Sequence, residues 1–183
     1  MTVLVGDSDS GAYTATDDTY DGGRLWVFSN TAVANGSAAK LYLYLAGFDA
    51  ATGVKLCLHN TSGTLLAATA AITTGSPGWV SASITPAAIT NGQDYFLGFV
   101  ANGNIQPYND GSTWASNWVT MDYASPGNFS PGSLANVNKG WCALYAETAA
   151  GGGPVTIALP STGGAAVGTG ARGTQIPNLS VPL

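Results

Sequence analysis

Short runs in which hydrophobic and polar residues alternate recur along the whole chain. In residues 40–45, Leu41, Leu43 and Leu45 face one way, whereas Tyr42 and Tyr44 face the other. A period of two residues is typical of a β-strand with one buried face. A second such run sets Val54, Leu56 and Leu58 against Lys55, Cys57 and His59. Further strands are predicted over residues 25–29, 79–84, 95–101, 117–123 and 141–147.

Turn sequences rich in Gly, Asn and Pro separate these runs, as at Asn35-Gly36 and Asn91-Gly92. Residues 64–74 contain Leu and Ala and could form a helix, but the segment is short and lies between Gly63 and Gly75, which favours a strand. The predicted fold class is all-β, an antiparallel β-sandwich (jelly roll) with an extended C-terminal arm.

Composition supports this prediction. Charged residues make up 8% of the 183-residue chain, whereas long surface helices need Glu, Lys and Arg on their wet face. The pattern predicts a β-sandwich domain over 1–148, a Gly-rich hinge over 149–153 and an extended arm over 154–183.

The arm carries apolar side chains but no hydrophobic pattern long enough for a core of its own. One interpretation is a disordered tail. The other is an arm that becomes ordered against another subunit, with the anchoring side chains Ile157, Leu159, Ile176, Leu179 and Val181.

Four segments, taken in their order along the chain, resemble a known group of folds. The first is a predicted hairpin, formed by residues 54–58, the turn 60–63 and residues 65–69. The other three are Gly78-Trp79-Val80, residues 84–92 and residues 94–99. Over about residues 47–100 the chain resembles the carbohydrate-binding-module-like jelly-roll β-sandwich. Domains of this kind occur in bacteriophage structural proteins and bacterial extracellular proteins, so the resemblance implies a fold more than a function.

Charge, hydropathy and cysteine content indicate which classes of partner the chain can bind and in which compartment it is made. The net charge is −5, with five basic side chains, which argues against a nucleic-acid partner because phosphates require clustered Lys and Arg. The apolar runs are too short to span a membrane, and the N-terminus lacks a signal-peptide pattern. We expect a virion protein made in the host cytoplasm, with Cys57 and Cys142 as reduced, packed thiols.

No pattern of catalytic residues is found, and no catalytic residue or cofactor is predicted. His59 is the only histidine and Glu147 the only glutamate, and neither has a partner that its sequence neighbours would identify. His59 is better explained as a satisfied surface or edge histidine than as a base.

Alternating carboxylates at Asp7 and Asp9 suggest a metal site, because oxygen ligands bind hard cations. Asp-Ser-Gly sequences are also ordinary turn sequences, and an unliganded loop is the favoured interpretation.

Aromatic and polar residues also gather after residue 104. Tyr108, Asn109, Asp110, Trp114 and Trp118 could form a sugar-binding platform, because aromatic rings cover the apolar face of a pyranose. The alternative, which is favoured, is that these rings pack under a long loop or in a subunit interface.

The combined prediction is a non-enzymatic structural protein of a virus particle, a bacteriophage capsid decoration (head-surface) protein. Its partners would be the shell protein and copies of itself, with a trimer as the first expectation. The alternative is a carbohydrate-binding module of a phage fibre or bacterial surface assembly, which adds a glycan as partner.

Overall fold

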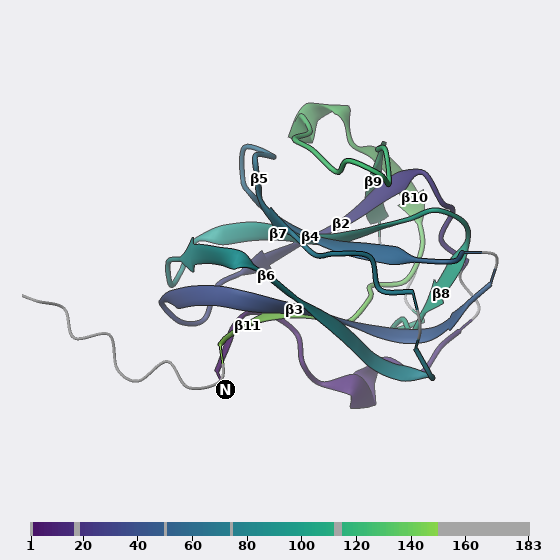
Figure 1. The fold of residues 1–183 in the computed structure, drawn as a ribbon, viewed down its shortest axis with the longest axis horizontal. Coiled ribbons are helices and arrows are strands. Elements are labelled where there is room, and N and C mark those ends of the chain that lie inside the picture. Colours follow the sequence, from purple (N-terminus) through teal and green to yellow (C-terminus); the bar gives the residue numbers. More distant parts are fainter. Residues whose placement is uncertain (1, 17–18, 50, 74, 112–114, 150–183) are drawn as a thin grey trace, which may run out of the picture. The chain divides into compact units, whose positions relative to one another are not determined.

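The computed structural model describes residues 2–16, 19–49, 51–73, 75–111 and 115–149. Two antiparallel sheets form the fold, as the alternation predicts (Figure 1). The strands are β1 (Val3–Gly6), β2 (Arg24–Thr31), β3 (Gly36–Phe48), β4 (Val54–Asn60), β5 (Leu65–Ala68), β6 (Gly78–Ile89), β7 (Asp94–Ala101), β8 (Ile105–Pro107), β9 (Ala115–Thr120), β10 (Ala135–Asn138) and β11 (Leu144–Thr148). The helical turns η1 (Ser10–Ala12) and η2 (Pro131–Ser133) have three residues each.

The first sheet has the order β1-β11-β3-β6, with β8 paired to β3, and the second has the order β10-β9-β2-β7-β4-β5. Chain-adjacent strands often lie in different sheets, as β2 and β3 do, which fits a sandwich. The prediction of an all-β antiparallel β-sandwich is confirmed.

The main hydrophobic core combines residues from both sheets. From the first sheet come Leu41, Leu43 and Leu45, which are at most 1% exposed, so the predicted alternation in β3 is confirmed. From the second sheet come Trp26 and Phe99, also fully buried. Burying large side chains of this kind stabilises the fold by about 1.5–3 kcal/mol each.

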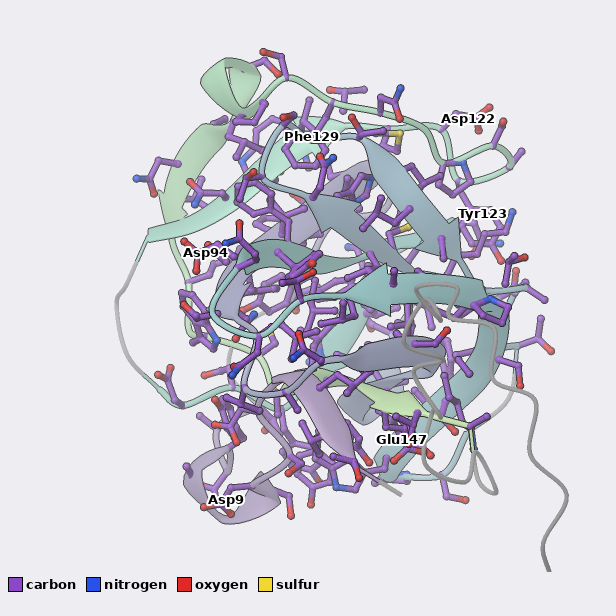
Figure 2. All side chains as sticks on the ribbon, turned by 90° about the vertical axis from the view of Figure 1, so that its left-hand side faces the viewer. Asp9, Asp94, Asp122, Tyr123, Phe129 and Glu147 are labelled. Carbon is purple, nitrogen blue, oxygen red and sulfur yellow. The ribbon has the colours of Figure 1, made fainter. Side chains whose placement is uncertain are left out.

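The second sheet is buried on its other face too. A smaller cluster there contains Leu25, Val27, Cys57, Val100 and Phe129. Phe129 comes from the segment between β9 and β10, which lies over this sheet (Figure 2). Val54, Leu56 and Leu58 do oppose Cys57 and His59 as predicted, but both faces of β4 are covered.

Both cysteines are buried thiols, as predicted, rather than partners in a disulfide. Cys57 belongs to the smaller cluster and Cys142 to the main core. Burial raises the pKa of the Cys57 thiol to about 12, although the nearby Lys55 acts to lower it. At neutral pH Cys57 is therefore a packed, protonated side chain.

Several boundaries differ from the sequence prediction. The segment 64–74 does contribute the strand β5 and not a helix, whereas β6 extends to Ile89, five residues beyond the predicted end. The short strands β1, β8 and β10 were not predicted, since three or four residues are too few to show an alternation.

The last described strand ends at Thr148, where the sequence predicts that the sandwich ends. The predicted arm and most of the predicted hinge lie outside the described residues. The anchoring role of Ile157, Leu159, Ile176, Leu179 and Val181 therefore stays a prediction. Within the described residues, no helix is long and apolar enough to cross a membrane.

Candidate functional site

Five aromatic side chains gather on the outer face of the first sheet, and we call them the aromatic strip. They are Tyr42 and Tyr44 on β3, Trp79 on β6, Tyr108 directly after β8 and Tyr145 on β11. Strand register explains why they meet. Tyr42 pairs with Tyr145 and Tyr44 pairs with Trp79, while the amide of Tyr108 donates to the carbonyl of Tyr44. Side chains of directly paired residues lie on the same face of a sheet.

The rings of the strip contact one another in a continuous series. The centroid distances are 4.5 Å from Tyr108 to Tyr44, 5.0 Å from Tyr44 to Trp79, and 5.0 Å from Trp79 to Tyr145. The last step, from Tyr145 to Tyr42, is 4.3 Å, with an interplanar angle of 7°. Each contact restricts the rotamers of both rings, so the strip is held in one arrangement before any ligand arrives.

The strip remains partly open to solvent. Tyr44, Trp79, Tyr108 and Tyr145 are each half-buried, whereas Tyr42 is 8% exposed. In the part of the chain that the structure describes, no protein group is hydrogen-bonded to the hydroxyls of Tyr44, Tyr108 and Tyr145. These hydroxyls can therefore bind a ligand without breaking a bond inside the protein.

Three tyrosines outside the strip use their hydroxyls internally. Tyr13 donates to Asp7, Tyr20 donates to the carbonyl of Gly140, and the Tyr95 hydroxyl accepts from the amide of Thr90. Buried hydroxyls need such partners because an unpaired one costs free energy. The hydroxyls of Tyr44, Tyr108 and Tyr145 differ from these three, because no described protein group pairs with them.

A carboxylate closes one end of the strip. Glu147 is 4% exposed and accepts a hydrogen bond from the Tyr42 hydroxyl. Burial first, and then this hydrogen bond, raise the pKa of Tyr42 above its ordinary value. Burial and the charge of Glu147 also raise the pKa of Tyr145. Both phenols are thus neutral at physiological pH.

A positively charged side chain, Lys40, also lies near the Tyr42 end of the strip. Lys40 pairs with Glu147 across the strands, and its ammonium lies 4.9 Å from the centroid of the Tyr42 ring. The cation–π contact holds the ammonium over the ring. The five residues of the strip are themselves uncharged, and Lys40 and Glu147 are charged neighbours at its Tyr42 end.

Of the five residues, only Tyr108 is predicted from the sequence as a site residue. The alternation places Tyr42 and Tyr44 together on the face opposite the leucines, which is the signal that the sequence contains. Trp79 and Tyr145 join them through the register of strands whose paired residues are 35 and 103 positions apart, which the sequence does not reveal.

The structure does not bring the five predicted sugar-binding residues into one platform. Tyr108 lies in the strip, whereas Asn109 is fully buried and its backbone bridges Ala15 and Cys142. Asp110 is exposed and accepts from the amide of Trp141. Trp114 lies outside the described residues.

Trp118 belongs to the other sheet. It lies on β9 and packs against the core, with its ring 6.2 Å from that of Trp26 and 4.0 Å from the guanidinium carbon of Arg24. Its indole nitrogen is buried and has no hydrogen-bond partner in the described structure. Trp118 is a packed side chain rather than part of the strip.

The loop of Asp7 and Asp9 uses its carboxylates internally. Asp7 accepts from the Asp9 amide and from the Tyr13 hydroxyl, each at 2.8 Å. Asp9 accepts from the Gly11 amide and begins the turn η1. Among the described residues, no group of three metal-ligating side chains is found. The geometry favours ordinary turn chemistry at these two residues.

His59 is fully buried, so its prediction as a surface or edge histidine was wrong. Its Nε2 lies 3.0 Å from the carbonyl oxygen of Gly127, and its ring packs edge-on to Phe129 at 4.9 Å. Nδ1 is buried and has no partner among the described residues. The Gly127 carbonyl can only accept, so the neutral imidazole donates from Nε2 and leaves the Nδ1 lone pair without a partner. Burial lowers the pKa of His59 from 6.5, against the opposing effect of the Gly127 carbonyl.

Stability should therefore fall in mild acid. Because the folded-state pKa of His59 is below the unfolded value, its contribution is fully present above about pH 6.5 and is lost as the pH falls further. We expect the free energy of unfolding of the wild type to drop, relative to His59→Gln, by up to about 1.4 kcal/mol per pH unit below that point. Urea unfolding from pH 7.5 to 4.5 measures this difference, and parallel pH curves for the two proteins would contradict it.

Comparison with known proteins finds no family model, no curated protein and no solved structure that matches this chain.

Proposed function

We propose that this chain is a non-enzymatic structural protein of a virus particle, a bacteriophage capsid decoration protein, and that it works by surface contact. The observation that carries the proposal is the aromatic strip. A series of five touching rings lies on the outer face of a regular sheet, with four of the rings half-buried. Tyr and Trp in such arrangements are typical of binding surfaces.

The amino-acid composition supports the proposal that the chain is a subunit of a virus particle. Only 8% of the residues are charged, and the buried core of an interface between subunits is depleted of charged residues. The arm of residues 154–183 supplies apolar side chains that would anchor the chain to a shell protein.

The strip also favours a second candidate function, a carbohydrate-binding module of a phage fibre or bacterial surface assembly. The specific observation is the pairing of ring surfaces with the hydroxyls of Tyr44, Tyr108 and Tyr145. In this candidate the domain is the binding part of a larger assembly rather than a subunit of a shell.

Particle composition tests the first candidate. We expect mass spectrometry of purified particles, from a culture that carries the gene, to find the chain in a fixed ratio to the shell protein. Rebinding to stripped particles should be strong for the full chain and at least tenfold weaker for a chain ending at residue 149. This reduction is expected because the truncation removes several large apolar anchors.

Two controls make the result interpretable. Circular dichroism must show the same β-signal for both chains, since all described strands end by Thr148. The full-length Trp79→Ala variant should rebind normally, because the proposed shell contact is made by the arm and not by the strip. Absence of the chain from purified particles would contradict the virion role.

A further inference from the structure

We infer that the aromatic strip binds a neutral hexose glycan, with the Trp79 indole as the ring on which a pyranose stacks. The inference rests on the proposed function in one respect, namely that the strip is a binding face. It goes further by naming the class of ligand and the position at which that ligand binds.

The ring geometry singles out Trp79. Tyr42 and Tyr145 stack on each other at 7°, and Tyr44 and Tyr108 stack on each other at 26°, so each of these rings has a face covered by its partner. Trp79 stands at 81° to Tyr42 and at 77° to Tyr145, and it is tilted by 39° from Tyr44. Its indole is the one strip ring with no parallel partner within the strip, and it is half-buried. A flat apolar surface of this kind complements the C–H face of a pyranose.

Three phenols belong to the same patch as this ring. The rings of Tyr44 and Tyr145 each lie 5.0 Å from Trp79 and Tyr108 stacks on Tyr44, and the hydroxyls of all three have no partner among the described residues. A phenol both donates and accepts a hydrogen bond, as a sugar hydroxyl does. The strip therefore offers stacking and hydrogen bonding within one patch, which is the combination that a sugar requires.

Glu147 positions part of this network. Its carboxylate accepts a hydrogen bond from the Tyr42 hydroxyl, so Tyr42 is oriented, and Tyr42 in turn stacks on Tyr145 at 4.3 Å. Glu147 is a positioning residue, because it is 4% exposed and acts on the strip through Tyr42. Rings held in this way lose little conformational entropy when a ligand binds.

The scarcity of charge selects a neutral ligand. Ser81 and Ser83 lie opposite Tyr42 and Lys40 on the neighbouring strand, and Lys40 and Glu147 are the charged residues at this end of the strip. An anionic polymer would require several cations on the face, whereas the chain holds five Lys and Arg in total. A neutral hexose chain carries hydroxyls and C–H faces, which match what the strip presents.

Calorimetric titration of the full chain with neutral oligosaccharides tests the inference. The probes are cellohexaose, maltohexaose, mannohexaose and laminarihexaose. We expect at least one to bind, and Trp79→Ala to weaken that binding by about tenfold or more, as is usual when a stacking ring is lost. The triple variant Tyr44→Phe, Tyr108→Phe and Tyr145→Phe keeps the rings and removes the hydroxyls, and it should also weaken binding severalfold.

Tyr123→Ala is the matched control. Tyr123 is half-buried like Trp79, but it belongs to the smaller cluster on the second sheet, away from Glu147 (Figure 2). This variant should bind the glycan as the wild type does. Thermal melts of all variants show whether each remains folded, and the triple phenylalanine variant keeps the test valid if Trp79→Ala does not fold.

Each other outcome has a definite meaning. Failure of all four probes to bind overturns the inference, and the proposed function stands if the chain is still found on particles. Unchanged binding by folded Trp79→Ala places the glycan elsewhere and overturns the assigned site. If Trp79→Ala instead changes the oligomeric state of the full chain in sedimentation experiments, the strip is an interface between copies and the inference is overturned.

Discussion

Replacing Phe99 by alanine should lower the free energy of unfolding by about 3–5 kcal/mol. Phe99 is fully buried on β7, the strand that lies between β2 and β4. Its ring contacts those of Tyr20, at 5.5 Å, and Phe28, at 6.2 Å. Truncation would remove the transfer free energy of the ring and leave a cavity that the surrounding strands cannot close.

Urea unfolding of the wild type and Phe99→Ala measures this loss, with Leu66→Ala as the control. Leu66 is a large apolar side chain of the same sheet that is 37% exposed, so its truncation should change the free energy by about 0.5 kcal/mol or less. A loss below about 1 kcal/mol for Phe99→Ala would mean that the two sheets do not pack around this ring.

Replacing Gly6 by alanine should destabilise the fold by about 2–5 kcal/mol, for two reasons that add. The φ angle of Gly6 is +94°, a conformation that a side chain strains. A Cβ atom at this position would also lie 2.1 Å from the carbonyl oxygen of Leu144, which is backbone and cannot rotate away. The edge pairing of β1 with β11 would have to shift, and β11 carries Tyr145 of the aromatic strip.

Gly92→Ala separates the two contributions. Gly92 has a similar φ of +77°, but a Cβ atom there meets nothing within 4 Å. We expect about 1–2 kcal/mol for this variant from the backbone conformation alone. The difference between the two losses measures the steric contribution at Gly6, and equal losses would show that β1 moves without cost.

These two predictions concern the scaffold, and neither variant replaces a side chain of the strip. Phe99 lies in the core between the sheets, whereas Trp79 lies on the outer face of the first sheet. A variant of Trp79 should therefore affect ligand binding more than folding, and a variant of Phe99 should do the reverse. Measuring both properties for both variants distinguishes a binding surface from a covered, structural one.

The sequence alone determined the fold class and several strands. Alternation in residues 40–45 correctly placed Leu41, Leu43 and Leu45 on one face and Tyr42 and Tyr44 on the other, and the structure shows that the leucine face lies in the core. This was predictable because the direction of a side chain in a strand depends on its position along the strand and on no distant contact. Burial of the two cysteines was predictable for a similar reason, since both lie in apolar runs.

Only the tertiary structure shows that the segment with Gly127 and Phe129 covers the outer face of the second sheet. The alternation in residues 54–59 gives no sign that His59 is buried, because the segment that contributes Gly127 and Phe129 is about 70 residues away. His59 therefore changes from a predicted surface residue to a buried one with a lowered pKa.

The aromatic strip depends on tertiary structure in the same way. Four separate segments supply its rings, and the register of β3 with β6 and with β11 brings them together. A shift of one residue in either pairing would turn Trp79 or Tyr145 to the core side of the sheet. Register results from packing of the whole sandwich, and for that reason the sequence showed the aromatic residues without showing that they form one surface.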